Sequence, residues 1–172
     1  MPLGSKNADY ALKDYWDQRF EEEDEYDWLL GFKDLECCIP PLLEEQCTRT
    51  GKTKETLCIL ILGCGNSTFS ADLYDYGYTN LVNIDFSATV IAKMKKMHEG
   101  ARPSMQWLEM DMLDMSSFGL ACFDVVIDKA TMDALMVGEA DSWSPTDSCL
   151  ADGHTYCQQV SHVLRRDDAG GL

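Results

Sequence analysis

The sequence has few positive charges and no long apolar run. Its 172 residues include 14 lysines and arginines against 30 aspartates and glutamates, which gives a formal net charge of −16 at pH 7. Such a charge opposes contact with a polyanion, so a nucleic-acid substrate is disfavoured. No apolar run approaches the roughly 18 residues of a membrane span, and the first residues do not form a basic and apolar signal region. These absences predict a cytoplasmic protein that binds neither nucleic acid nor membrane.

Patterns that would hold a metal ion or a disulfide framework are also missing. The eight cysteines include no C-x-x-C pair, and the three histidines are scattered along the chain. We therefore predict free thiols, several of them buried, and no metal site. With 172 residues, 45% of them hydrophobic, the sequence is long enough for one compact domain with its own core.

The most informative stretch is Cys58 to Ser67, in which an apolar run ends in two glycines. Residues 57–62 are all apolar, which is the pattern of a strand covered on both faces. Gly63 and Gly65 have no Cβ, so the backbone can turn tightly there and approach a ligand. An ordinary turn between a strand and a helix is the alternative explanation for a lone G-x-G.

A second signal supports a nucleotide site. Asp85 ends another apolar segment, about 20 residues after the glycine turn, where an acid accepts hydrogen bonds from a ribose. Thr68 replaces the third glycine of the dinucleotide fingerprint, and the G-x-x-x-x-G-K-[ST] phosphate loop is absent. No lysine or arginine lies beside the turn in the sequence. These features favour an adenosine-type ligand without phosphates.

Hydrophobic periodicity predicts alternating strands and helices. Near the start, a helix over 9–20 would place Leu12, Trp16 and Phe20 on one stripe. The alternation that follows gives a parallel sheet with right-handed crossovers and helices on both faces. We expect strands at 57–62, 81–85, 105–109 and 123–127, and helices at 67–76, 87–98 (capped by Ser87) and 154–164.

Shorter segments complete this prediction. Residues 26–32 are rich in aromatic side chains and are expected to pack on the domain, and Pro40 and Pro41 are expected in the first turn of a helix. A polar connector would follow over 48–56. The polar stretch 138–153 is either a lid over the site or a disordered insertion. In the second core helix, one face is expected in the core: Val90, Ile91, Met94 and Met97.

Four segments together resemble a known family. They read L-G-C-G-N-S at 62–67, N-I-D-F-S at 83–87, M-D-M at 110–112 and F-D-V-V-I-D-K-A-T-M-D-A-L at 123–135. This set is similar to the class I S-adenosylmethionine-dependent methyltransferases, and within them to the branch that methylates lysines of translation elongation factor 1-alpha. The aromatic residues and charges of 15–20 and 26–28 match that branch as well.

The resemblance implies the fold, the cofactor and the partner. The fold would be a Rossmann-like, doubly wound α/β sheet, and the cofactor S-adenosylmethionine. The partner would be a basic protein, translation elongation factor 1-alpha. The run Glu21 to Asp27 has six acids in seven residues; it is either a solvated loop or a guide for such a basic surface.

The resemblance also implies which residues hold the cofactor. Gly63 would line its methionine portion, and Gly65 would also lie at the cofactor. Asp85 would take the ribose hydroxyls, with Phe86 against the adenine.

Further cofactor contacts are implied around the adenine and the sulfonium. Asp111 would accept from the adenine amino group, and the backbone of Met112 would meet the ring; a surface acid at a strand end is the alternative for Asp111. Trp16, Phe20 and Trp28 would contact the cofactor, because an aromatic face attracts a sulfonium cation. Plain core packing of an N-terminal helix is the alternative for these aromatic residues.

The segment 128–133 resembles the family's acid-K-G-T-L-D motif, with Ala130 in place of glycine and Met132 in place of leucine. One of its two aspartates is expected to orient the incoming lysine amine and favour proton loss, unless both merely cap the following turn. If residue 130 has a positive φ, alanine strains the turn by roughly 1 kcal/mol. The implied catalytic residues are Asp128, Lys129, Thr131 and Asp133, and Lys129 is also implied at the cofactor.

The end of the sequence departs from the family after Leu164. The resemblance covers about the first two thirds of a full fold, so we expect the last three strands to be lacking. Strand 123–127 would then be an edge strand, and the monomer would be marginally stable or self-associate through it. We divide the chain into an N-terminal helical cap that contributes to the cofactor site (1–56), a partial methyltransferase core (57–164) and a divergent tail (165–172).

Three functions remain open from the sequence. The first is a protein-lysine N-methyltransferase that uses S-adenosylmethionine and acts on translation elongation factor 1-alpha. The second is a catalytically inactive truncated form, or a fragment that only binds the cofactor. The third is a small-molecule methyltransferase, since a fold does not fix the acceptor.

Overall fold

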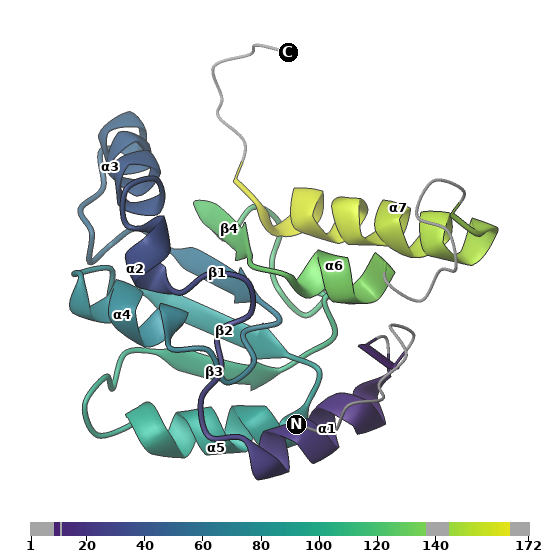
Figure 1. The fold of residues 1–172 in the computed structure, drawn as a ribbon. Helices are drawn as coiled ribbons and strands as arrows, with labels where there is room; N and C mark the ends of the chain where they lie inside the picture. The colour runs from purple at the N-terminus through teal and green to yellow at the C-terminus, as the bar shows by residue number, and fades with distance from the viewer. Residues whose placement is uncertain (1–8, 11, 137–144, 166–172) are drawn as a thin grey trace.

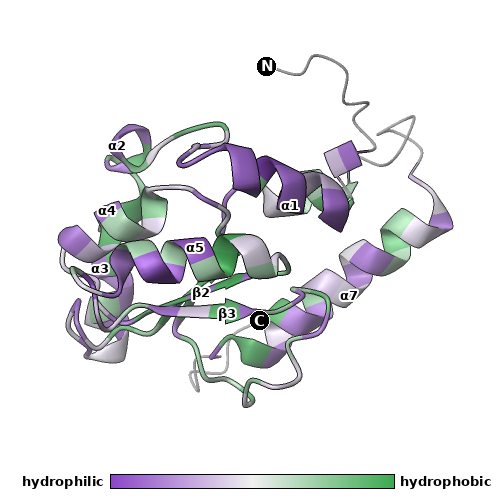
Figure 2. Cartoon of the chain, turned by 90° about the horizontal axis from the view of Figure 1, so that it is seen from below, coloured by the Kyte–Doolittle hydropathy of each residue, from purple (hydrophilic) through white to green (hydrophobic). Residues whose placement is uncertain are grey.

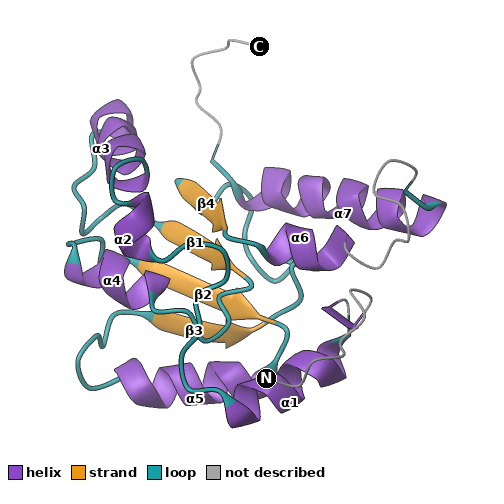
Figure 3. Ribbon diagram, viewed as in Figure 1, coloured by secondary structure: helices purple, strands orange, loops and turns teal. Residues whose placement is uncertain are grey.

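The computed structural model describes residues 9–10, 12–136 and 145–165. Within this part, four parallel strands in the order β3-β2-β1-β4 form one sheet with helices on both faces (Figures 1 and 3). This confirms the predicted Rossmann-like, doubly wound parallel sheet. The strands are β1 (Ile59–Leu62), β2 (Leu81–Asp85), β3 (Gln106–Glu109) and β4 (Val125–Asp128). The helices are α1 (Lys13–Glu22), α2 (Phe32–Leu35), α3 (Ile39–Thr50), α4 (Phe69–Asp75), α5 (Ala88–His98), α6 (Thr131–Met136) and α7 (Asp147–Val163).

The central strand β1 divides the core into two layers. Ile59 and Ile61 pack with side chains of α1 to α5, whereas Leu60 and Leu62 pack on the other face with side chains that include those of α7. Successive side chains of a strand point to opposite faces, so an uninterrupted apolar run is what a sheet covered on both sides requires. Figure 2 shows α1 beside α5 on one face, with α1 largely hydrophilic.

Local capping signals place several helices as predicted. Ser87 accepts a hydrogen bond from the Val90 amide at 3.3 Å and caps α5. The Ser67 hydroxyl accepts from the Phe69 amide at 3.1 Å, at the start of α4. Prolines occupy the first turn of α3, where a missing N–H costs no helical hydrogen bond.

Helix α7 is longer than predicted, because it begins at Asp147 and not at residue 154. The Thr146 side chain accepts from the Cys149 amide and caps it there. Cys149 and Tyr156 are both buried along its length. The alternative of a disordered insertion is therefore wrong for residues 147–153, whereas the alternative of a lid stays a prediction; residues 138–144 of that stretch lie outside the described part.

Three further predictions need correction. Helix α1 begins at Lys13, and Leu12 precedes it with 55% of its surface exposed, so Leu12 is not part of a buried stripe. Met97 is 40% exposed, unlike the other apolar residues of its predicted face. The polar connector is shorter than expected, because α3 continues to Thr50 and ends at Gly51, whose φ of +68° only glycine adopts without strain.

The cysteines differ widely in burial. Cys64 and Cys149 are buried, whereas Cys37, Cys38 and Cys157 are exposed. The expectation of buried thiols therefore holds for only some of them.

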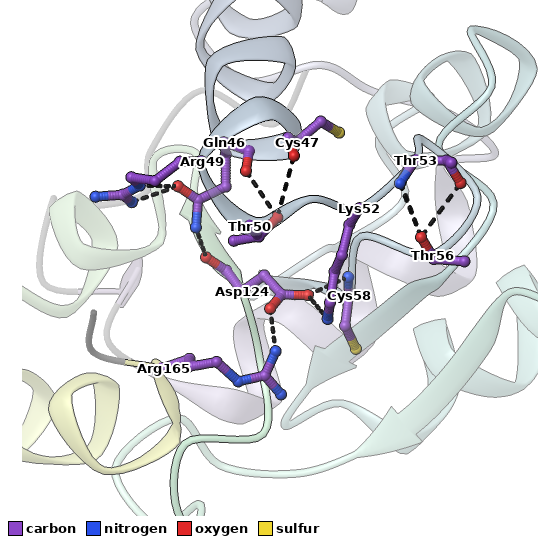
Figure 4. Close-up of polar contacts among 10 residues, drawn as sticks. All are labelled: Gln46, Cys47, Arg49, Thr50, Lys52, Thr53, Thr56, Cys58, Asp124 and Arg165. Carbon is purple, nitrogen blue, oxygen red and sulfur yellow. Dashed lines mark hydrogen bonds and ion pairs between the residues drawn. The ribbon is translucent and has the colours of Figure 1, made fainter. Parts of the chain in front are cut away.

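A buried carboxylate fastens the start of β4 to distant parts of the chain (Figure 4). Asp124 is 2% exposed, and its side chain accepts from the Cys58 amide at 2.8 Å and pairs with the Lys52 ammonium at 2.5 Å. Arg165 forms a second ion pair with the same carboxylate, and Gln46 donates to the Asp124 carbonyl oxygen at 2.9 Å. Because the buried charge has two cations and an amide, its desolvation is offset.

Strand β4 lies at one edge of the described sheet. It pairs with β1 along its whole length, and all four of its residues are only partly buried, in contrast to those of β1. Next to its other edge, a single parallel bridge joins Phe123 to Leu164. Among the described residues, the helices are too short or too polar to cross a bilayer.

Candidate functional site

A cavity of about 540 Å³ opens at the carboxyl ends of the strands, which is where open α/β sheets bind ligands. Its wall combines the glycine turn after β1, the ends of β2, β3 and β4, helix α1 and the segment that follows α1. All but one of the residues predicted at the site line this cavity. They are Trp16, Phe20, Trp28, Gly63, Gly65, Asp85, Phe86, Asp111, Met112, Lys129, Thr131 and Asp133; Asp128 is the exception.

The glycine turn needs both of its glycines. Gly63 and Gly65 each have a φ of +52°, a conformation that strains residues with a side chain. A Cβ at Gly63 would also lie 2.2 Å from the Thr131 methyl carbon, which leaves no room for one. At Gly65 the nearest atoms would be in the Phe20 ring at 3.6 Å, so there only the backbone conformation demands glycine.

Asp85 is a buried acid held by the backbone. One of its carboxylate oxygens accepts from the Gly65 amide at 3.0 Å, and the other accepts from the Ser87 amide at 2.9 Å. Burial raises the pKa of Asp85 from 3.8 to about 6, although the two amide hydrogen bonds act in the opposite direction. The carboxylate of Asp85 is therefore held in one orientation by two hydrogen bonds, and its pKa lies close to neutral pH.

Aromatic rings form the wall on the α1 side. Trp16 stacks on Phe20 with ring centroids 5.6 Å apart, and Trp16 meets Trp28 edge to face at 5.7 Å. The Arg19 guanidinium lies 4.8 Å from the ring centroids of both Tyr26 and Trp28. These rings therefore already attract one cation, in the way an aromatic wall would attract a sulfonium.

The carboxylate of Asp128 points into the β4–α6 turn and toward α7. It accepts from the Thr131 amide at 2.9 Å and from the Met132 amide at 3.1 Å, and the Tyr156 hydroxyl donates to it at 2.9 Å. Burial and the nearby carboxylate raise the pKa of Tyr156. These contacts favour the capping alternative for Asp128, while its predicted role toward the acceptor amine stays a prediction.

The turn after Asp128 has the positive φ at residue 130 that the family motif suggested. Ala130 has a φ of +71°, which confirms that a glycine-type position carries an alanine here. The Thr131 hydroxyl donates to the Leu62 carbonyl at 3.0 Å and thereby docks this turn on the end of β1. Thr131 thus holds two cavity-forming turns together.

Charged side chains of the cavity differ in how far they are paired. Lys13 pairs with Asp17 at 2.9 Å, and the Lys129 ammonium lies 3.4 Å from Asp27. Asp133 and Asp152 also line the cavity, and neither has a hydrogen-bond or ion-pair partner among the described residues. Those residues contain no group of three or more histidine, cysteine or acidic side chains arranged to hold a metal ion.

Several lining residues were not predicted. Lys13 and Tyr10 come from the start of the N-terminal segment, and no pattern in the sequence marks them. Asp152 comes from the first half of α7. The signal that could have found Asp152 is the apolar spacing of Cys149 and Tyr156, which extends the helix back past residue 154.

Comparison with known proteins identifies relatives of this chain. A family model described as a methyltransferase domain matches residues 59–143. The mouse protein "EEF1A lysine methyltransferase 4" is 34% identical over 172 residues, which cover 98% of this chain and 62% of that relative. The human protein "eEF1A lysine and N-terminal methyltransferase" is 37% identical over 177 residues, which cover 95% of this chain and 24% of that relative.

The parallel sheet, the glycine turn and these matches make the chain similar to the class I S-adenosylmethionine-dependent methyltransferases. Within that class, the relatives that it matches are named as eEF1A lysine methyltransferases, the branch that its motifs resemble. The chain spans about three fifths of the length of the first of these relatives.

Proposed function

We propose that the chain is a protein-lysine methyltransferase that binds S-adenosylmethionine in the cavity and acts on translation elongation factor 1-alpha in the cytoplasm. The observation that carries this proposal is the convergence of the glycine turn, Asp85 and the Asp111–Met112 turn on one cavity. The cavity is large enough for a nucleoside ligand. Relatives with 34% and 38% identity are named as eEF1A lysine methyltransferases, which supports the choice of acceptor.

The residues present fit the cofactor. Each oxygen of the Asp85 carboxylate accepts one backbone amide and retains a lone pair for a ribose hydroxyl. Phe86, Asp111 and Met112 all line the cavity, which supports their proposed contacts with the adenine ring and its edge. Without side chains, Gly63 and Gly65 let the backbone come close to the methionine portion.

When bound, S-adenosylmethionine supplies a methyl group on a sulfonium, and its leaving group is a neutral thioether. The protein then needs to align the acceptor amine with that methyl group and to keep the amine neutral. In our proposal Asp133 orients the acceptor and favours its proton loss, because it lines the cavity and has no partner among the described residues. Asp128 and Thr131 hold the turn that presents Asp133.

The test measures cofactor binding and turnover separately. Calorimetry with S-adenosylhomocysteine measures binding in the cavity. Mass spectrometry of purified elongation factor 1-alpha detects methylated lysines. We expect Asp85→Ala to lose both signals. Asp75→Ala is the matched control, because Asp75 is a surface acid that pairs with Arg102 away from the cavity; it should keep both. Asp133→Asn should keep binding and lose about 100-fold in turnover.

Each result decides between the functions that the sequence left open. Binding without any methylated lysine would favour a fragment that only holds the cofactor. Methylation of a small molecule in place of the protein would redirect the proposal to another acceptor. Absence of binding by the unaltered chain would refute the cofactor assignment itself.

A further inference from the structure

The segment that joins α1 to α2 is fastened to the rim of the cavity. We call residues 23–30 the strap. Tyr26, Trp28 and Leu29 of the strap line the cavity. The Tyr26 amide donates to the Asn66 carbonyl at 3.3 Å, and the Asn66 side chain donates to the Glu23 carbonyl at 3.3 Å. The strap is thus hydrogen-bonded to the turn that was assigned to the cofactor.

Asp27 is the centre of this attachment. Its carboxylate accepts from the Ser67 hydroxyl and, at 3.1 Å, from the Thr68 hydroxyl, both of which directly follow the glycine turn. The same carboxylate lies 3.4 Å from the Lys129 ammonium, which comes from the turn after β4. One acid therefore connects the strap to two turns that lie more than 60 positions apart in the sequence.

Lys129 is directed at the strap. Its ammonium donates to the Trp28 carbonyl oxygen at 3.0 Å, in addition to its pairing with Asp27. Its side chain is only 13% exposed, so the positive charge is well shielded from solvent. The contacts of Lys129 thus hold Trp28 in place.

The strap also contains a strained residue. Leu29 has a φ of +64°, and the Leu30 amide donates to the Trp28 carbonyl at 2.8 Å, which closes a three-residue turn of the rare, strained type. Leu29 is 73% exposed, so burial of its own side chain does not hold it there. Such a conformation persists only where surrounding contacts fix it, and the contacts of Asp27 and Lys129 flank it on the chain and in space.

We propose that Asp27 and Lys129 are a pair of positioning residues, which hold the strap, and with it Trp28 and Leu29, against the cavity. Neither residue needs to touch the reacting atoms. The pair holds the strap in its cavity-lining conformation before a ligand binds. The strap therefore loses its conformational entropy when the chain folds and not when the ligand binds. The part of this inference that concerns ligand affinity rests on the function proposed above.

The first experiment needs no ligand. Hydrogen–deuterium exchange of the strap amides should be about tenfold faster in Asp27→Asn and in Lys129→Met than in the unaltered chain, because local opening exposes amides that are now protected. Asp24→Asn is the matched control. Asp24 lies in the same strap, but its side chain is 93% exposed and pairs with Lys93 at the surface, so exchange should be unchanged.

The second experiment measures affinity for S-adenosylhomocysteine by calorimetry. Each variant should bind about tenfold more weakly, and the double variant should bind no more weakly than either single variant, since the two residues act as one unit. Thermal melts followed by circular dichroism separate this local effect from general unfolding.

The outcomes separate the two proposals. Unchanged strap exchange in both Asp27→Asn and Lys129→Met would refute the pair, whether or not the chain binds the ligand. Faster exchange with unaltered affinity, or additive losses in the double variant, would also refute it as a positioning pair for the cavity. If the unaltered chain fails to bind, the proposed function falls, while the exchange result still decides whether the pair holds the strap.

Discussion

Ala130 has a backbone conformation that is unfavourable for a residue with a side chain. Its φ of +71° lies in the region that glycine occupies freely and alanine does not. We expect Ala130→Gly to raise the free energy of unfolding by about 1 kcal/mol, because relief of the strain exceeds the added freedom of the unfolded chain. Urea denaturation followed by circular dichroism measures this change.

A matched substitution tests the cause of that gain. Ala88 is an exposed residue in the first turn of α5, where Ala88→Gly should lower the free energy of unfolding by up to about 1 kcal/mol. If Ala130→Gly destabilised the chain as much as Ala88→Gly does, the strain at residue 130 would not be real.

The titration of Asp85 makes ligand binding depend on pH. An ionised carboxylate accepts ribose hydroxyls better than a protonated one, and the pKa of Asp85 is about 6. Affinity for S-adenosylhomocysteine should therefore fall as the pH drops below 6, by up to about tenfold per pH unit. Calorimetry at several pH values measures this, and Asp85→Ala should show no measurable binding at any of them. A constant affinity from pH 5 to 8 would contradict the assignment.

The effect of Asp85 on stability has the opposite sign. Its pKa in the folded chain is raised above the ordinary value of 3.8, so the folded state binds the proton more tightly. The stabilising contribution is therefore full below pH 3.8 and is lost as the pH rises to about 6. At neutral pH the buried charge costs stability, and the residue is retained in a place where a ligand can use it.

At the scale of elements, local signals in the sequence predicted the strands well. β2 spans Leu81–Asp85 as predicted, and the other three strands begin one or two residues later than expected. Apolar runs and the Ser87 cap are local properties, which explains this success. The sequence predicted too late a start for α7, because the first half of this helix is polar and the cap from the Cys149 amide to the Thr146 side chain is not visible in the hydrophobic pattern.

The candidate site was predictable as a set of residues but not as a set of contacts. The family resemblance implied twelve residues that line one cavity. It did not show that Asp128 turns away from the cavity toward Tyr156, or that Asp27 and Lys129 meet across 102 positions of sequence. Such contacts depend on how the elements pack, and single-residue patterns do not encode that.

At the scale of the whole molecule, the net charge and the β4 edge have opposite effects on self-association. In the described part, β4 pairs along its length only with β1, and an edge of this kind is a template for association. The formal charge of −16 repels a second copy. We therefore expect a monomer at about 0.02 M salt and increasing self-association at about 0.3 M salt, where the repulsion is screened.

Sedimentation velocity at several protein concentrations measures this balance. Sedimentation that does not depend on concentration at either salt level would show that the edge is blocked, and that the predicted self-association is wrong. A chain that associates more strongly at low salt would show that unlike charges, and not the edge strand, drive the contact.

The Asp124 cluster has a consequence for how the chain folds. The partners of Asp124 stand 78, 72, 66 and 41 positions away along the sequence, so none of them is secured by local structure. A partly folded chain that has formed only the N-terminal helices, or only α7, leaves a shielded negative charge without one of its cations. Such intermediates are destabilised, and the segment 46–58, the start of β4 and the end of α7 are expected to become ordered together in one cooperative transition.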